Sequence, residues 1–241
     1  MIVLLIVFFS ILTYIGLVVI KPLVTRTIVG GLALILLLGS VGILTLHMAD
    51  NYGTKEVTTT SQSSSVYTAG DLSAPYGMII KSEIGQNTGN YVFVFRTSAT
   101  EKKAQVQFKP TTTTIMDVVD AVKKSADYQL TSRQKPVIIT KTVRRVFSST
   151  LTKLLFEWGG QANQLVSQHV ILEVPDKTWL VLTQAQIEKL QKLAPQMQKE
   201  QEATLKSNPQ EALAMEKMKT QDPQAYAALQ VTQIKKALGI N

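Results

Sequence analysis

The sequence contains no cysteine and only two histidines among its 241 residues. Without cysteine there is no disulfide framework, no thiolate zinc or iron–sulfur site and no thiol nucleophile. Charged residues are scarce at 17%, whereas hydrophobic residues make up 45%. This composition excludes a disordered polyelectrolyte, and the length allows one or two domains. Two histidines are too few for a His-rich metal centre, so we expect no metal and no cofactor.

Two long charge-free runs stand at the N-terminus. Fifteen of the nineteen residues in 2–20 are Val, Ile, Leu or Phe, which favours the bilayer by about 6 kcal/mol. Residues 28–46 form a second uncharged run of nineteen, about 28 Å long as a helix and close to the hydrocarbon thickness. We therefore predict two transmembrane helices, about 2–20 and 28–46, within a hairpin domain 1–50. Two buried core helices are the alternative. A signal peptide is disfavoured for the first run, since it lacks a basic start and a cleavage site.

The segment between the two runs is a short basic turn. Pro22 cannot continue the first helix, so the chain is expected to reverse after it. Gly31 and Gly42 lie eleven residues apart on one predicted face of the second helix. Small residues let helix backbones approach in a membrane, so these two glycines predict where the first helix packs.

Charge in the short loops predicts the orientation. Lys21 and Arg26 are the only basic side chains before Lys55. The positive-inside rule places them in the cytoplasm, and hence the N-terminus and the C-terminal domain outside the cell membrane. The Ser/Thr-rich residues 58–65 would then form an extracytoplasmic stalk.

Residues 51–182 are predicted to form a β-rich domain. Residues 91–97 are aromatic and β-branched, and residues 104–108 alternate strictly between polar and apolar, which is typical of strands. Five further segments have similar features: 77–84, 137–147, 151–158, 170–174 and 178–182. Pro175–Lys177 is expected to close a hairpin, and Gly159–Gly160 to make a turn. We predict an antiparallel meander of about seven strands.

One helix is expected near residues 115–126, inside the β-rich domain. Its apolar residues have helical spacing, and Thr114 with Asp117 resembles a capping box. The fold class expected for the whole chain is a membrane hairpin followed by a mainly antiparallel α+β domain and a helical tail.

Residues 183–241 are rich in Gln, Lys, Ala and Met and predict a tail of three amphipathic helices. Thr183 with Gln186 can cap the first, which Pro195 should kink. Asn208 and Asp222 each precede Pro-Gln, a good helix start, and Gly239 is a good stop. The apolar stripes are narrow, so these helices should pack weakly unless a partner or the bilayer orders them.

No catalytic constellation is evident. Ser132 and Lys135 match the S-x-x-K pattern of penicillin-binding enzymes, but Pro136 opposes the helix that this pattern requires. Asp117 and Asp120 are better explained as surface carboxylates than as an acid–base pair. His47 and His169 share no motif and are expected to be structural. We therefore assign no catalytic, cofactor-binding or metal-binding residue and expect no enzyme.

The net charge of +8 is spread along the chain. Residues 51–185 contain 15 basic and 10 acidic side chains, and residues 186–241 contain 8 and 6. A nucleic-acid module would cluster its charge with exposed aromatics, so no nucleic acid is expected. The lipid bilayer, other membrane proteins and anionic envelope polymers are the expected partners.

The two spans, the basic turn, the Gln/Lys/Ala-rich tail and the motif HMADNYGTKEVTTT at residues 47–60 resemble an uncharacterised family of membrane proteins. That family is a domain of unknown function found mainly in Gram-positive lactic-acid bacteria. The resemblance implies a two-span membrane protein and no activity. We expect a non-enzymatic envelope interaction or assembly component. The alternatives are an accessory subunit of a membrane transporter or enzyme complex and, more remotely, a hydrolase with an unrecognised site.

Overall fold

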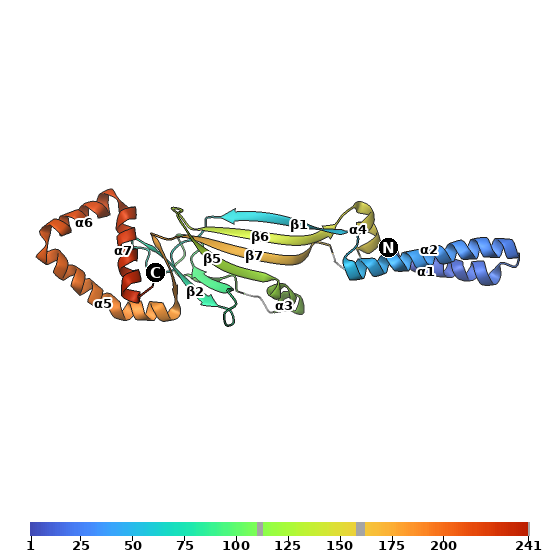
Figure 1. The fold of residues 1–241 in the computed structure, drawn as a ribbon, viewed down its shortest axis with the longest axis horizontal. Helices are drawn as coiled ribbons and strands as arrows, with labels where there is room; N and C mark the ends of the chain where they lie inside the picture. The colour runs from blue at the N-terminus through green and yellow to red at the C-terminus, as the bar shows by residue number, and fades with distance from the viewer. Residues whose placement is uncertain (110–112, 158–161, 241) are drawn as a thin grey trace. The chain divides into compact units, whose positions relative to one another are not determined.

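A computed structural model describes residues 1–109, 113–157 and 162–240. Its elements are, in order, α1 (Ile2–Tyr14), η1 (Ile15–Val19), α2 (Leu23–Asp50), β1 (Thr54–Ser63), β2 (Gly77–Glu83), β3 (Tyr91–Phe95), β4 (Gln105–Gln107), α3 (Ile115–Val122), β5 (Lys124–Thr131), β6 (Val137–Phe147), α4 (Thr150–Phe156), β7 (Gln164–Pro175), β8 (Trp179–Thr183), α5 (Gln184–Ser207), α6 (Pro209–Gln221) and α7 (Pro223–Leu238) (Figure 1). Two apolar helices, mostly antiparallel sheets and C-terminal helices confirm the predicted α+β class.

The chain divides into two compact units. Unit 1 comprises Met1–Thr59 and Thr142–Ser167, and unit 2 comprises Thr60–Lys141 and Gln168–Asn241. Unit 1 therefore contains the hairpin and α4, whereas α3 and the three C-terminal helices belong to unit 2. Strands β1, β6 and β7 are each divided between the two units.

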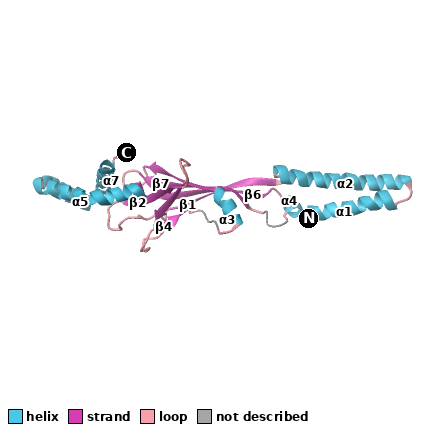
Figure 2. Cartoon of the chain, turned by 90° about the horizontal axis from the view of Figure 1, so that it is seen from below, coloured by secondary structure: helices cyan, strands magenta, loops and turns pink. Residues whose placement is uncertain are grey.

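The predicted helical hairpin is present in unit 1, and α1 and α2 lie side by side (Figures 1 and 2). The first helix ends as a single π-helical turn, closed by the bond from the Ile20 N–H to the Ile15 carbonyl. Ile20 and Pro22 are extended, as expected at a proline. The turn is nevertheless shorter than predicted, because α2 begins at Leu23 and already contains Arg26. It continues to Asp50, where Asn51 adopts a left-handed conformation and ends it.

The helices approach each other at different glycines from those predicted. A Cβ added to Gly16 would lie 2.7 Å from the Gly30 Cα, so the two backbones touch there. Nothing lies within 4 Å of a Cβ added to Gly31 or Gly42. The prediction for Gly31 and Gly42 was therefore wrong. Spacing within one helix cannot show which face meets its neighbour, and Gly16 on the first helix selects Gly30.

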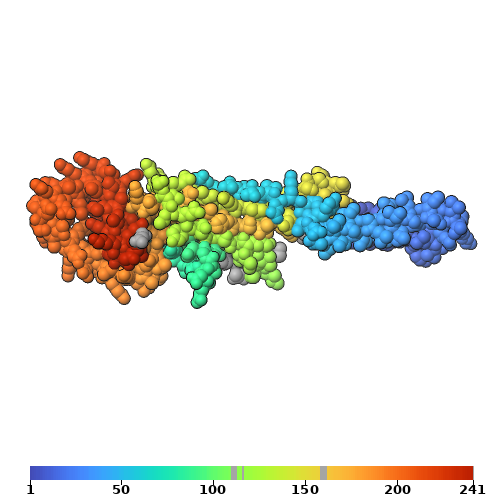
Figure 3. Space-filling model, viewed as in Figure 1, coloured from blue at the N-terminus to red at the C-terminus, as the bar shows by residue number. Residues whose placement is uncertain are grey.

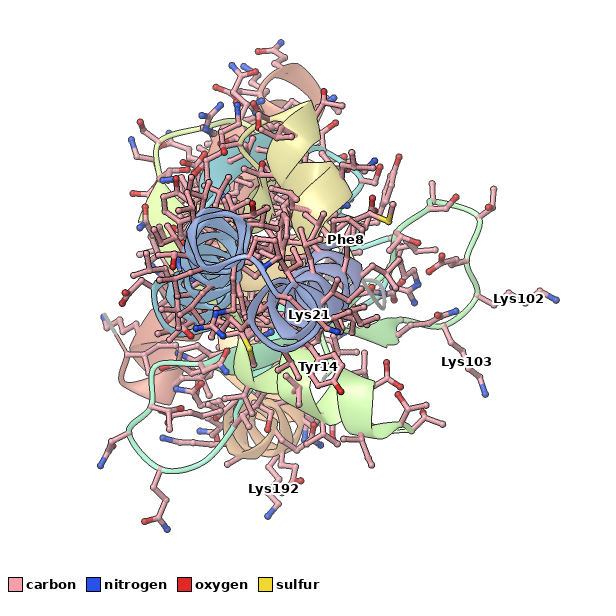
Figure 4. The ribbon with its side chains drawn as sticks, turned by 90° about the vertical axis from the view of Figure 1, so that its right-hand side faces the viewer. Phe8, Tyr14, Lys21, Lys102, Lys103 and Lys192 are labelled. Carbon is pink, nitrogen blue, oxygen red and sulfur yellow. The ribbon has the colours of Figure 1, made fainter. Side chains whose placement is uncertain are left out.

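Both helices of the hairpin are long and apolar enough to cross a membrane. Only 17% and 11% of their apolar windows are buried, which is too little for the core helices of a soluble domain. Tyr14, for example, points away from the hairpin (Figure 4). In the space-filling view the hairpin helices form one continuous surface (Figure 3).

Two local predictions near the hairpin were wrong. Residues 58–65 do not form a stalk, because most of them belong to β1, which pairs with β6. Residues 151–158 were predicted as a strand, but Thr150–Phe156 form helix α4. A capping box between Ser149 and Thr152 stabilises the start of this helix. A local cap thus outweighs the β propensity of this short segment. The predicted turn at Gly159–Gly160 lies outside the described residues.

The described residues form two four-stranded sheets rather than a meander. Their orders are β1-β6-β7-β5 and β4-β3-β2-β8. Strands β2 and β8 pair in parallel, as do β5 and β7. Strands β7 and β8 belong to different sheets, so Pro175–Lys177 does not close a hairpin as predicted. Strand β5 was missed, and the helix expected over 115–126 ends at Val122 because Ala126 is buried in β5.

The core of unit 2 consists of aromatic and aliphatic side chains from both sheets. Phe93 and Phe95 of β3, Ile79 of β2, and Leu172 and Val174 of β7 are fully buried in it. The strand predicted at 91–97 from its aromatic and β-branched residues is thus confirmed as β3 over Tyr91–Phe95. The core thereby fixes the start of β2, which leads into the site described below.

The tail forms the three predicted helices, and its caps are confirmed. Thr183 and Gln186 form a capping box, Asn208 and Asp222 cap α6 and α7, and Gly239 is left-handed. Helix α5 contains Pro195 and changes direction along its length (Figure 1). The expectation of weak packing is wrong for α7. This helix buries three apolar side chains against β8 and the start of α5: Val231, Ile234 and Leu238.

Candidate functional site

A large cleft opens between the tail helices of unit 2. Helices α5, α6 and α7 are arranged like the sides of a triangle (Figure 1). The cleft between them has a volume of about 820 Å³, within the range of ligand-binding pockets. Its apolar lining comes from all three helices and from strand β2, including Met78, Ile187, Leu190, Met197, Met215 and Ile234. Three other pockets in the described part of the chain are smaller, at about 170, 520 and 180 Å³.

The two helices on the open side of the cleft are loosely held. Helix α6 buries no residue, and within α5 only Ile187 is buried. The contact between them includes a weak hydrogen bond, which the Gln201 side-chain amide donates to the Met215 sulfur at 3.5 Å. Thioether side chains adapt to irregular apolar surfaces. Few buried contacts therefore hold α6 and the second half of α5 in place beside the cleft.

The polar lining of the cleft is mainly amide rather than charged. Five glutamines contribute to it: Gln191, Gln198, Gln201, Gln230 and Gln233. The Gln230 Nε2 atom is buried and has no hydrogen-bond partner among the described residues. The charged groups are Glu200, Glu211 and Lys236, so neither sign dominates. Such a lining suits a neutral, amphipathic occupant that offers hydrogen-bond acceptors.

Tyr76 lies at the edge of the cleft beside strand β2. Burial raises the pKa of its phenol above the ordinary value, and the negative charge of Asp71 raises this pKa further. The pKa of Asp71 is in turn lowered, chiefly because the Ser73 backbone N–H donates to its carboxylate at 2.9 Å. Tyr76 therefore remains a neutral hydrogen-bonding group at the cleft over the physiological pH range.

The structure also brings together three polar side chains that the sequence did not link. His169 of β7 is the register partner of Ser125 on β5, and its Nδ1 lies 2.8 Å from the Ser125 Oγ. Its Nε2 lies 3.5 Å from the Asp127 carboxylate. The sequence could not reveal this cluster, because Ser125 and His169 are 44 positions apart. They become neighbours only when β5 and β7 pair in parallel.

These three side chains lack the surroundings of a hydrolytic triad. Ser125 is in a regular strand rather than at a sharp strand-to-helix turn, where it would project beside free backbone donors. The His169 and Asp127 side chains are 40% and 35% exposed, so water is not excluded. The arrangement is best described as a hydrogen-bonded surface cluster.

The other sequence candidates are dispersed. Ser132 and Lys135 lie in the loop between β5 and β6, not on a helix. Asp117 caps α3, whereas Asp120 pairs with Lys123 at 3.6 Å. His47 stacks on Phe156 in unit 1. Within the described ranges, no group of three or more potential ligands could hold a metal ion.

A protein-family model, described as a domain of unknown function, matches residues 23–190. The chain belongs to the DUF4811 family. The DUF4811 match includes α2, both sheets and the first residues of α5, whereas most of the cleft lining follows it in the sequence. Comparisons with curated proteins and with solved structures found no match.

Proposed function

We propose that this protein is a non-enzymatic, membrane-anchored interaction component of the cell envelope. The proposal rests on the exposed apolar surface of the hairpin. Its two helices have the length of a bilayer span and leave most of their apolar side chains uncovered. In this proposal the basic turn is cytoplasmic, and the remainder of the chain from Asp50 faces outward at the surface of a Gram-positive cell.

The cleft of unit 2 favours one form of this function, that of an accessory subunit. We propose that it binds an amphipathic segment of another membrane protein. Methionine and aliphatic side chains line it, and its glutamines can pair with the polar side of such a segment. The nearly balanced charge of the lining disfavours an anionic polymer as the occupant of this particular site.

Site-specific photo-cross-linking in native membranes tests this function. A photoreactive amino acid at Met197, which lines the cleft, should cross-link to one membrane protein, and mass spectrometry should locate the attachment in an apolar segment. The matched control is the same amino acid at Leu213, which is 64% exposed on α6 and does not line the cleft. Filling the cleft by Ala194→Trp should abolish the Met197 product. Equal products from both positions, or products with lipid alone, would contradict the proposal.

The hydrolase alternative has its own test at the Ser125 cluster. A fluorophosphonate reacts with an activated serine and not with an ordinary hydroxyl. We expect no covalent adduct at Ser125 after incubation of the intact protein, and no difference between the wild type and Ser125→Ala. Stoichiometric labelling of Ser125 that is lost in His169→Gln would establish an enzyme instead.

A further inference from the structure

Helix α4 presents an exposed apolar face that the anchoring hairpin does not explain. Leu151 and Leu154 lie on the same side of this short helix and are 64% and 58% exposed. On its other side, Phe156 is buried. Two adjacent leucines that are mostly exposed on a seven-residue helix leave apolar area in water that a membrane or a partner could cover.

The unequal lengths of the hairpin helices indicate where α4 lies relative to a bilayer. The first helix has 18 residues and α2 has 28, which correspond to about 27 Å and about 42 Å. Gly16 lies against Gly30 in this antiparallel pair, so the start of α1 is level with about residue 44 of α2. The last six or so residues of α2 therefore extend about 9 Å beyond the start of α1. A hydrocarbon core of about 30 Å covers the first helix, and the extra length of α2 reaches through the headgroup region.

Helix α4 is fixed against this extra length of α2. The His47 ring of α2 stacks on the Phe156 ring with centroids 4.0 Å apart and planes 3° from parallel. The His47 Nδ1 is held in turn by the Tyr52 carbonyl at 2.7 Å. At the other helix, the Met1 amino group donates to the Leu155 carbonyl at 3.1 Å. Figures 1 and 2 both place α4 beside the N-terminus, at the end of the hairpin opposite its turn.

We propose that α4 is an interfacial membrane helix, which lies in the headgroup region with Leu151 and Leu154 directed into the lipid. The proposal rests on the membrane anchoring proposed above. It commits to lipid because α4 is joined, through Phe156 and Leu155, to the ends of two helices whose apolar side chains are mostly uncovered. Lys153, whose exposed ammonium group lies 3.7 Å from the Glu157 carboxylate, can also reach lipid phosphates. The hairpin and α4 then form one anchor that spans the bilayer and rests on one of its surfaces.

Depth-dependent quenching in proteoliposomes tests the proposal. The chain has no cysteine, so an NBD dye can be attached to a single cysteine in the full-length protein. The variants are Leu151→Cys on α4, Ile35→Cys in the middle of α2 and Leu213→Cys in unit 2. The vesicles contain lipids with a nitroxide either at the headgroup or deep in the acyl chain. A second measurement avoids the apolar dye. A nitroxide is attached at position 151, and its accessibility to oxygen and to a nickel complex is measured by electron paramagnetic resonance, which reports its depth in the bilayer.

We expect headgroup nitroxides to quench position 151 at least twofold more than deep nitroxides do, the reverse order at position 35, and little quenching at position 213. Quenching at position 35 without quenching at position 151 would overturn the interfacial helix and leave the anchoring intact. Absence of quenching at position 35 would overturn the anchoring itself. A position 151 that is unquenched in vesicles but shielded in native membranes would assign the leucines to a protein partner and overturn the lipid proposal.

Discussion

At the residue scale, the closest contact in the hairpin depends on Gly16 and Gly30. Because the Gly30 backbone occupies the space that a Gly16 side chain would need, Gly16→Ala should force the helices apart, at a cost of about 1–3 kcal/mol. Nitroxide labels at the exposed positions 11 and 35 should lie farther apart in Gly16→Ala than in the wild type, as measured by double electron–electron resonance. Gly31→Ala is the matched control, since open space surrounds that glycine. The same distance in both variants would contradict the packing described.

The second residue-scale prediction concerns the titration of Tyr76. Burial favours its neutral form, so its pKa lies above the ordinary value of about 10. A raised folded-state pKa contributes stability below the unfolded-state value, and this contribution is lost as the pH rises through the folded-state value. The difference in absorbance at 295 nm between the wild type and Tyr76→Phe should isolate this phenol. Asp71→Asn should lower its pKa slightly, because the neighbouring negative charge is removed. A phenol that titrates below 10 would refute the burial.

The sequence predicted residues with local roles and failed for those with long-range roles. The caps at Thr114, Thr183, Asn208 and Asp222 were correct because a cap involves only three or four adjacent residues. The contact between Gly16 and Gly30 could not be predicted, since it depends on how two helices rotate against each other. The approach of Ser125 to His169 was missed for the same reason, because it requires the register of β5 with β7.

At the element scale, the three tail helices should differ in stability. Helix α7 buries four residues, whereas α6 buries none. Amide hydrogen exchange follows local opening, which buried apolar contacts suppress. We expect exchange in the centre of α7 to be slower than in α6 by a factor on the order of 100. Occupation of the cleft should selectively slow exchange in α6 and in the second half of α5. Uniformly slow exchange from Gln184 to Leu238 in the isolated protein would contradict this.

Side-chain composition predicted elements well where an element contributes to a core. Residues 91–97 were read correctly because they are aromatic and β-branched, and Phe93 and Phe95 of β3 are buried. Periodicity failed for β1, a strand whose residues are nearly all exposed, so that no apolar alternation exists to be read. The cleft could not be predicted either. The apolar stripes of the three tail helices are narrow, and the sequence does not show which sides of these helices remain uncovered after packing.

At the scale of the whole molecule, charge in the turn should determine the topology. Lys21 lies in the turn and Arg26 in the first turns of α2, and both should stay in the cytoplasm. A single cysteine at Ser64 should react with a membrane-impermeant maleimide on intact cells. Lys21→Glu with Arg26→Glu, together with lysines added near Asn51, should give mixed labelling. Wild-type labelling that occurs only after lysis would place the C-terminal part of the protein in the cytoplasm.

The division of unit 1 along the chain has a consequence for biosynthesis. Its first segment ends at Thr59 and its second begins at Thr142, so the ribosome makes the hairpin well before α4. At about 5–20 residues per second, the delay is several seconds or more. During that time the His47 ring has no Phe156 to stack on. The end of α2 therefore lacks its contact with α4 for the whole of this interval and can gain it only after residue 156 has been made.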